Sequence, residues 1–533
     1  MKISKIVSVA LLLSASAYGQ NSLQNAIKNT DNELFTESEK QLKTLITYEP
    51  QNDLNYFYLG ENFYAQKEKD SALVYWKKAY NVAPTSLFAK VSMAKSLLVE
   101  GKKEDAKLLL AEVIKPRTKD AELLRVVAKT YLVTDTKNFD EIISLLNRAI
   151  ELDAKNEVNY LLLGDALLAQ TPTNGNNAIR EYNKVLDINP KSPRGLVRIG
   201  KLYQRVNADS LANANYQEAQ RIDPTYAPAY RENAELFLNS NKPKKAIENW
   251  KKYLELNNSL EARYRYSTAL FSGKQYCEAI TELLYLKNNA FTNSFVERML
   301  TYSYAECTSD KENANKGLVS SDDFFRITST DKINYLDFIY RGKLLSNLGT
   351  DSLALFEYEK AINLDIRAKK DVSGILASTY LKLKNYSKAI ENYEYKRAND
   401  KLTPAELFEL GRAYFVGMKN YVKADSVFMT LNEVSPSFAP GHYWRALSNH
   451  QLDLSMEKWL AKPFYEKTIL AIKVEDRLKG NNKKMSIESA QYLGGYYERS
   501  LEKDINKAKE YWKLVAELDP LNESAKQFLN KNK

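Results

Sequence analysis

Residues 56–84 read YFYLGENFYAQKEKDSALVYWKKAYNVAP, and residues 196–224 read LVRIGKLYQRVNADSLANANYQEAQRIDP. The two stretches carry bulky, small and proline residues at eight equal offsets without an insertion: Tyr56, Leu59, Gly60, Phe63, Ala72, Trp76, Ala79 and Pro84 match Leu196, Ile199, Gly200, Tyr203, Ala212, Tyr216, Ala219 and Pro224. In each stretch the apolar residues recur three and four positions apart in two runs, which indicates two amphipathic helices separated by a turn. We therefore predict a helical hairpin in each.

The same spacing returns along the chain. Matching sets are Tyr160, Leu163, Gly164, Ala178, Tyr182 and Pro190; Tyr230, Ala234, Phe237, Ala246, Trp250 and Tyr253; Gly342, Ala354, Tyr358 and Ala361; Gly411, Tyr414, Ala424, Phe428 and Pro436; and Gly494, Tyr497, Ala508, Trp512 and Pro520. Between Asp53 and Asn522 they make about 13 units. We number the steps of a unit from its first residue, which is Asp53 in the first full unit. Small residues at the eighth and twentieth steps, such as Gly60 and Ala72, allow the two helices of a unit to approach closely, while the aromatic residues fill the space between them.

This pattern resembles the tetratricopeptide-repeat (TPR) family, whose period is about 34 residues. The resemblance implies an all-α, right-handed superhelical solenoid of about 13 helix-turn-helix units with one continuous core. It also implies a concave groove lined by the first helix of each unit, chiefly by its second, fifth, sixth, ninth, twelfth and thirteenth residues. Members of the family use this groove to bind other polypeptides.

The ends and two interior stretches depart from the repeat. We therefore divide the chain into a signal peptide over 1–19, N-terminal capping helices over 20–52, a first array half over 53–314, an irregular joint over 315–334, a second array half over 335–450, an extended loop and linker over 451–486, a last unit over 487–522 and a C-terminal capping helix over 523–533. Capping helices are expected because a solenoid must cover its terminal apolar faces.

The first residues have the three parts of a secretory signal peptide. A basic start, Met1 to Lys5, precedes an apolar run from Ile6 to Leu13 and then small residues up to Gly19. The apolar run is too short to span a bilayer, and no later segment reaches about twenty apolar residues. We predict an exported, periplasmic or secreted protein, for which nucleic acid is a poor candidate partner. Removal of the signal lowers the formal charge from +10 to +8. The remaining positive charge gives a mild preference for acidic partners.

The sequence offers little material for catalysis. The chain has two histidines, His442 and His450, and two cysteines, Cys277 and Cys307. More than 130 residues separate the two pairs, so a zinc site made from both is excluded. The chain contains no phosphate-binding glycine loop, nucleophile elbow or His-Glu-x-x-His helix. We predict no enzymatic activity, cofactor or metal, and interpret His442 as a packing residue.

The cysteines support a separate hypothesis. In a TPR stack Cys277 would begin a second helix and Cys307 would end the next first helix, and these ends lie at the same edge of adjacent helices. In an oxidising compartment a disulfide between them would contribute about 3–4 kcal/mol. The alternative is two buried free thiols. Two alkylatable thiols in the unreduced, denatured protein would rule out the bond.

The resemblance places a strip of cations in the groove. Arg194, Arg198, Lys201 and Arg205 are spaced by four, three and four residues, which puts them on one helical face, and Arg231 of the next unit would extend the strip. Such a face would bind acidic or C-terminal carboxylate groups through charge-assisted hydrogen bonds. The alternative is that these cations pair with Glu232 and Glu235 of the neighbouring helix.

Aromatic residues occupy the corresponding positions of the first full unit. There the groove steps carry Phe57, Tyr58 and Tyr64, so this part would hold an apolar or extended segment. Our leading hypothesis is a non-enzymatic scaffold of the cell envelope that binds a segment of a protein partner in the concave groove. The alternative is an envelope carbohydrate-binding protein whose groove aromatics stack on sugar rings.

Overall fold

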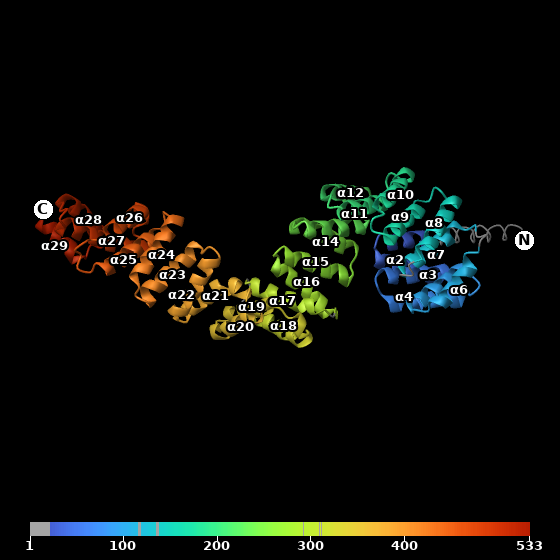
Figure 1. The fold of residues 1–533 in the computed structure, drawn as a ribbon, viewed down its shortest axis with the longest axis horizontal. Coiled ribbons are helices and arrows are strands. Elements are labelled where there is room, and N and C mark those ends of the chain that lie inside the picture. Colours follow the sequence, from blue (N-terminus) through green and yellow to red (C-terminus); the bar gives the residue numbers. More distant parts are fainter. Residues whose placement is uncertain are drawn as a thin grey trace, which may run out of the picture. The chain divides into compact units, whose positions relative to one another are not determined.

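The computed structural model describes residues 22–115, 119–134, 138–291, 293–308, 310 and 312–532. Every secondary-structure element within these ranges is a helix, as the periodicity predicts (Figure 1). The signal peptide predicted over 1–19 lies outside the described residues. The chain divides into two compact units, unit 1 over Met1–Val296 and unit 2 over Glu297–Lys533.

Unit 1 starts with an N-terminal hairpin made by a helix over 22–31 and α2 (Phe35–Tyr48). The first helices of the following hairpins are α3 (Asp53–Ala65), α5 (Leu87–Val99), α7 (Ala121–Val133), α9 (Glu157–Gln170), α11 (Pro193–Arg205), α13 (Ala227–Asn239) and α15 (Leu260–Ser272). Their second helices are α4 (Lys69–Val82), α6 (Lys103–Val113), α8 (Phe139–Leu152), α10 (Gly175–Ile188), α12 (Asp209–Ile222), α14 (Pro243–Leu256) and α16 (Tyr276–Asn288).

Unit 2 continues the alternation. Its first helices are α17 (Ser294–Glu306), which begins just before the boundary, α19 (Tyr335–Asn347), α21 (Ala368–Lys382), α23 (Pro404–Arg412) with the π-helix η2 (Ala413–Gly417), α25 (Ala439–Leu452) and α27 (Gly480–Arg499). Its second helices are α18 (Asn313–Ile327), α20 (Asp351–Leu364), α22 (Tyr386–Asn399), α24 (Tyr421–Val434), α26 (Lys462–Ala471) and α28 (Ile505–Leu518). The 3-10 turns η1 (Thr330–Lys332) and η3 (Val474–Asp476) lie between helices, and α29 (Glu523–Lys531) follows the last hairpin.

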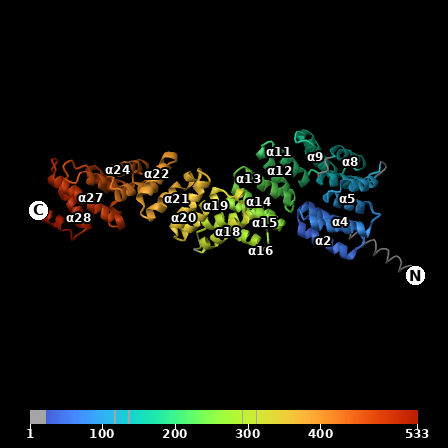
Figure 2. The same cartoon turned by 60° about the horizontal axis from the view of Figure 1, so that its bottom comes forward.

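The described helices from α3 to α28 form thirteen hairpins. Within twelve of these hairpins the first helix packs against the second, and in the remaining one Gly317 of α18 lies against Tyr304 of α17. The hairpins follow one another in chain order within each unit (Figure 2). Prolines begin several of the helices, including Pro193 and Pro404, because the first helical position needs no N–H donor. The predicted all-α repeat fold is confirmed.

The eighth-step glycines set the distance between the helices of a hairpin. A Cβ placed on Gly164 would lie 2.3 Å from the ring of Tyr182, and one placed on Gly200 would lie 2.6 Å from the ring of Tyr216. Both tyrosines are almost fully buried. The aromatic ring of the second helix therefore lies directly on the glycine backbone of the first, as the sequence pattern predicts.

We expect Gly60→Ala to destabilise the first full hairpin by about 1–3 kcal/mol. The new Cβ would lie 2.4 Å from the indole of Trp76, which is fully buried. The gain in helix propensity, about 1 kcal/mol, offsets only part of this cost. Gly175→Ala is the matched control, because no atom lies within 4 Å of its Cβ position. Urea denaturation that finds the two variants equally stable would contradict this packing explanation.

The predicted irregular joint over 315–334 is helical over most of its length. Residues 313–327 form α18, the second helix of the hairpin that α17 begins. Gly317 lets this helix approach Leu344 and Tyr304, and Phe324 is buried. Small residues replace the usual aromatic pattern here, which made the segment look irregular. The additional length of this repeat follows the helix, at η1.

The predicted extended loop over 451–486 also contains regular structure. The carboxylate of Asp453 accepts the backbone N–H groups of Lys458 at 3.1 Å and Leu460 at 3.3 Å, which orders the turn after α25. Helix α26 follows, with Tyr465 buried against α25 and α27. Helix α27 begins at Gly480 instead of at the predicted residue 487, because its early turns bury Met485 in the same core.

Candidate functional site

The first helices of unit 1 line a cavity of about 800 Å³. Its walls come from the N-terminal helix and from α3, α7, α9 and α11, with the turns that precede α9, α11 and α13. The lining includes Lys28, Asp31, Tyr58, Glu61, Glu122, Arg125, Val126, Lys129, Glu157, Arg194 and Arg198. Charges of both signs therefore face the cavity beside short apolar stretches.

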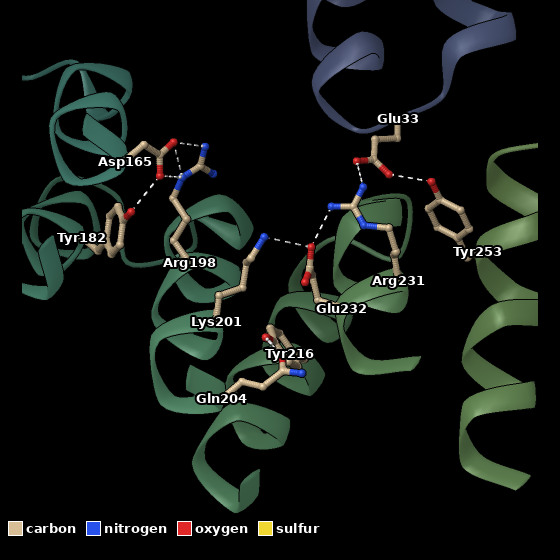
Figure 3. Close-up of polar contacts among 10 residues, drawn as sticks. All are labelled: Glu33, Asp165, Tyr182, Arg198, Lys201, Gln204, Tyr216, Arg231, Glu232 and Tyr253. Carbon is tan, nitrogen blue, oxygen red and sulfur yellow. Dashed lines mark hydrogen bonds and ion pairs between the residues drawn. The ribbon is translucent and has the colours of Figure 1, made fainter. Parts of the chain in front are cut away.

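A second cavity, of about 470 Å³, adjoins the predicted cation strip. It is lined by all five of the predicted cations, Arg194, Arg198, Lys201, Arg205 and Arg231, and by four carboxylates, those of Asp31, Glu33, Asp165 and Glu232. The structure thus brings the predicted strip together on α11 and α13, and Figure 3 shows three of its members, Arg198, Lys201 and Arg231. It also places almost as much negative charge beside it, which the sequence analysis did not foresee.

Arg198 binds Asp165 of the preceding unit through a bidentate pair. Its Nε lies 2.9 Å from Oδ1, and its Nη2 lies 2.8 Å from Oδ2. Tyr182 donates its hydroxyl to the same carboxylate at 2.7 Å (Figure 3). Burial alone would lower the pKa of Arg198, but the Asp165 carboxylate outweighs it and raises that pKa above the ordinary value. Arg198 is therefore held as a cation by the solenoid itself.

Lys201 and Arg231 share the carboxylate of Glu232. Lys201 Nζ lies 3.2 Å and Arg231 Nη2 lies 2.7 Å from Oε1 (Figure 3). Burial alone would raise the pKa of Glu232, but the two cations outweigh it and lower that pKa. The alternative that the cations of the strip pair with Glu232 and Glu235 thus holds for Glu232. Glu235 instead lies 3.8 Å from Arg265, which is not part of the strip.

Arg194 and Arg231 pair with the turn of the N-terminal hairpin. Arg194 contacts the carboxylate of Asp31, and Arg231 contacts that of Glu33. Arg205 has no ion-pair partner among the described residues. Four of the five predicted cations are therefore neutralised internally, so the groove presents much less positive charge than the strip suggests. The predicted preference for an acidic partner is not supported by these pairs.

The predicted groove aromatics are mostly parts of the packing. Phe57 is 2% exposed and packs edge to face on Tyr58 and Phe88. Tyr58 reaches the cavity but donates its hydroxyl to Glu122 at 3.1 Å. The hydroxyl of Tyr64 donates to the carbonyl oxygen of Val133 at 3.3 Å. Phe57 therefore offers no ring face to a sugar, contrary to the carbohydrate alternative.

A buried ion pair at the cavity wall escaped the sequence analysis. Glu61, 9% exposed, contacts Lys95, 1% exposed, and lies 3.6 Å from Lys129. The ammonium of Lys95 also lies 4.8 Å from the ring of Trp76. Burial lowers the pKa of Lys95; it would raise that of Glu61, but the two lysines outweigh it and lower the Glu61 pKa.

The signal for this pair was present in the repeat register. Glu61, Lys95, Lys129, Asp165, Lys201 and Glu235 all occupy the ninth step of consecutive first helices. This step faces the groove in the family pattern, so Glu61 can meet the lysines at the same step of the next two units. The opposite signs of Glu61 and the two lysines are the sequence signal for their contacts. The register alone is not sufficient, because Asp165, Lys201 and Glu235 at the same step have other partners.

His442 occupies the position expected of a packing residue. His442 is 8% exposed; it accepts the amide of Asn432 at 2.8 Å through Nδ1 and donates through Nε2 to the Pro436 carbonyl oxygen at 2.8 Å. Burial lowers its pKa, which favours this neutral form. Cys277 lies at the start of α16 and Cys307 directly follows α17, and neither is a free thiol. The pairing of the two remains a prediction for mass analysis.

Among the described residues, no group of three or more histidine, cysteine, aspartate or glutamate side chains is arranged to hold a metal ion. No helix in the same ranges is long and apolar enough to cross a membrane.

The comparisons with known proteins point to one repeat family. Residues 372–394, in α21 and α22, match the profile of the tetratricopeptide repeat. No curated protein matches the chain.

Three of the solved structures to which parts of the chain are similar are described as TPR proteins. The C-terminal part of a TPR repeat-containing protein from Cytophaga hutchinsonii is 30% identical over 50% of this chain and 99% of that one, with a TM-score of 0.41. A tetratricopeptide repeat protein from Parabacteroides merdae is 17% identical over 46% of this chain and 93% of its own, with a TM-score of 0.30. A thermophilic TPR protein from Thermus thermophilus is 20% identical over 41% of this chain and 98% of its own, with a TM-score of 0.30.

Proposed function

Because the chain belongs to the tetratricopeptide-repeat family, we propose that it is a non-enzymatic scaffold that holds a segment of a partner protein in the groove of unit 1. The observation that carries this proposal is the cavity of about 800 Å³ lined by the N-terminal helix and four first helices, α3, α7, α9 and α11. Its volume is within the range of sites that enclose a ligand, about 300–1,000 Å³.

The groove walls are fixed before any partner arrives. Pairs such as Arg198–Asp165 and Lys201–Glu232 join neighbouring first helices across the groove surface. A preformed surface loses little conformational entropy on binding, so a short, flexible partner segment bears most of the ordering cost. This favours recognition of an extended segment over a large folded surface.

The cell envelope is the proposed location. The basic start, apolar run and small residues of positions 1–19 favour export through a signal peptide. Cell fractionation combined with N-terminal sequencing of the mature protein tests this part of the proposal. A protein recovered from the cytoplasm with Met1 still present would contradict it.

Site-specific photo-crosslinking tests the groove itself. We expect a benzophenone amino acid at Tyr58 or Val126, both of which line the cavity, to crosslink the same short segment of one partner protein in envelope preparations. The same probe at Leu108, which is 69% exposed on the second helix α6, is the matched control and should not capture that segment. Equal capture at all three positions, or capture at Leu108 alone, would place binding outside the groove.

A further inference from the structure

The turn of the N-terminal hairpin, residues 31–33, carries an acidic residue where its backbone disfavours one. Glu33 has a φ of 60°, in the left-handed region that glycine and asparagine adopt most readily. Corresponding turns in the described part of unit 1 have Asn207 and Asn241 at such a φ, and also two lysines, Lys67 and Lys274, but no other acidic residue. The backbone therefore does not explain a glutamate at position 33, and its side-chain contacts must be considered.

Both carboxylates of the turn bind groups that lie far away in the sequence. Asp31 pairs with Arg194 on α11, and Glu33 pairs with Arg231 on α13. Tyr253 on α14 donates its hydroxyl to the second oxygen of Glu33 at 2.8 Å (Figure 3). The backbone N–H of Ala227 donates to the Asn32 carbonyl oxygen at 3.3 Å. Two guanidinium groups, a phenol and a backbone amide thus hold three consecutive residues, as a peptide-binding site would.

The N-terminal hairpin is anchored elsewhere by different forces. Leu23, Ala26, Leu42 and Leu45 are buried in the same apolar core as Leu59 of α3. By contrast, the contacts of the turn with α11, α13 and α14 are hydrogen bonds and ion pairs. The paired carboxylates and guanidinium groups are 16–34% exposed, whereas Asn32 and Tyr253 are buried. Release of the turn therefore breaks polar contacts, while the apolar core that anchors the rest of the hairpin stays closed.

We infer that Arg194, Arg231 and Tyr253 form a receptor for a partner segment with two carboxylates two residues apart, and that the Asp31–Glu33 turn occupies this receptor until such a segment displaces it. The inference rests on the proposed function and names the chemistry of the partner. Guanidinium groups form charge-assisted hydrogen bonds with carboxylates, and these bonds are stronger than the hydrogen bonds of neutral side chains. Because the turn is tethered, its effective concentration at the receptor is on the order of millimolar. A partner segment displaces it only when the segment's affinity and concentration together exceed this competition.

A peptide copied from the turn tests the inference with the full-length mature protein. The probe is the synthetic segment Lys28–Thr36, KNTDNELFT, and the released protein is the Asp31→Asn/Glu33→Gln variant. We expect calorimetry to show that the probe binds the released variant at least about tenfold more tightly than the unchanged protein, in which the tethered turn competes. Binding should weaken as salt is added, because it depends on ion pairs.

Two controls make the result specific. A probe with Asn and Gln in place of its two acidic residues should bind neither protein, and Arg231→Gln added to the released variant should abolish binding. If the double variant unfolds, Glu33→Gly serves instead, since glycine suits the left-handed backbone at this position. A folded variant that does not bind the probe, or equal binding by the unchanged protein, overturns the inference. Groove crosslinking of a partner at Tyr58 would remain intact in that case, so the two proposals fail separately.

Discussion

Replacement of Glu61 by glutamine should reduce the local free energy of unfolding by about 3–5 kcal/mol. The substitution leaves the ammonium of Lys95, which is only 1% exposed, without its carboxylate and near a second cation, Lys129. Breaking a buried ion pair from one side is costly because the remaining charge stays desolvated. Hydrogen exchange of the α3 and α5 amides measures the effect locally, which suits a repeat protein that opens in parts.

The control is the reciprocal substitution, and the two costs should be unequal. Lys95→Met removes the buried ammonium, while Glu61 keeps Lys129 at 3.6 Å, so we expect a smaller loss. The double variant Glu61→Gln/Lys95→Met should be more stable than Glu61→Gln alone, because no unpaired charge remains buried. Equal costs for the two single variants would mean that the desolvated ammonium does not determine the stability of this pair.

The pH dependence of Glu61→Gln has a defined sign. Burial lowers the pKa of Lys95 in the folded protein, and the variant lacks the carboxylate that opposes this shift. The unfolded chain then binds more protons than the folded one between the folded pKa and the unfolded value of about 10.4. The stability of the variant should therefore increase as the pH rises from about 7 to about 9.

The fold was predictable because one spacing governs both sequence and packing. Gly164 and Tyr182 are eighteen residues apart in the printed sequence, and they meet because the ring needs the space that a missing Cβ leaves. Where small residues replaced the aromatic, as around Gly317 in α18, the helix remained but the pattern did not reveal it. Periodicity thus predicts repeats whose packing uses the usual residue types, and fails where a different combination fills the same space.

The site was predictable in position but not in charge. The register placed Arg194, Arg198 and Arg231 on the groove face, where the structure has them. It gave no indication that Asp31 and Glu33 would reach the same face from more than 160 residues away. That contact depends on how far the superhelix turns from α3 to α13, which no local pattern encodes. The result changes the design of experiments: reversing the charge of Arg198 would break its pair with Asp165, whereas Arg205 has no such pair within the described residues.

Asp337 is a buried acceptor that joins two helices of unit 2. Asp337 is 2% exposed, and its carboxylate accepts hydrogen bonds from Arg298 Nε at 2.8 Å and Nη2 at 2.9 Å. It also accepts the Tyr302 hydroxyl at 2.8 Å. It also accepts the backbone N–H of Asn334 at 2.8 Å and so caps α19. Burial, then the nearby Asp337, raises the pKa of Tyr302, which keeps its hydroxyl as a donor. One side chain thus connects α17 to the start of α19.

We expect Asp337→Ala to lower the local free energy of unfolding of α17 and α19 by about 3–5 kcal/mol. The loss combines a removed helix cap, a buried hydroxyl deprived of this acceptor and an arginine, 15% exposed, deprived of its carboxylate. Asp322→Ala is the matched control, because Asp322 pairs with Arg341 but is 67% exposed, so its removal should cost less than about 1 kcal/mol. Hydrogen exchange in α17 and α19 compares the two. Similar small losses would mean that α17 and α19 are held together by their apolar packing and not by this carboxylate.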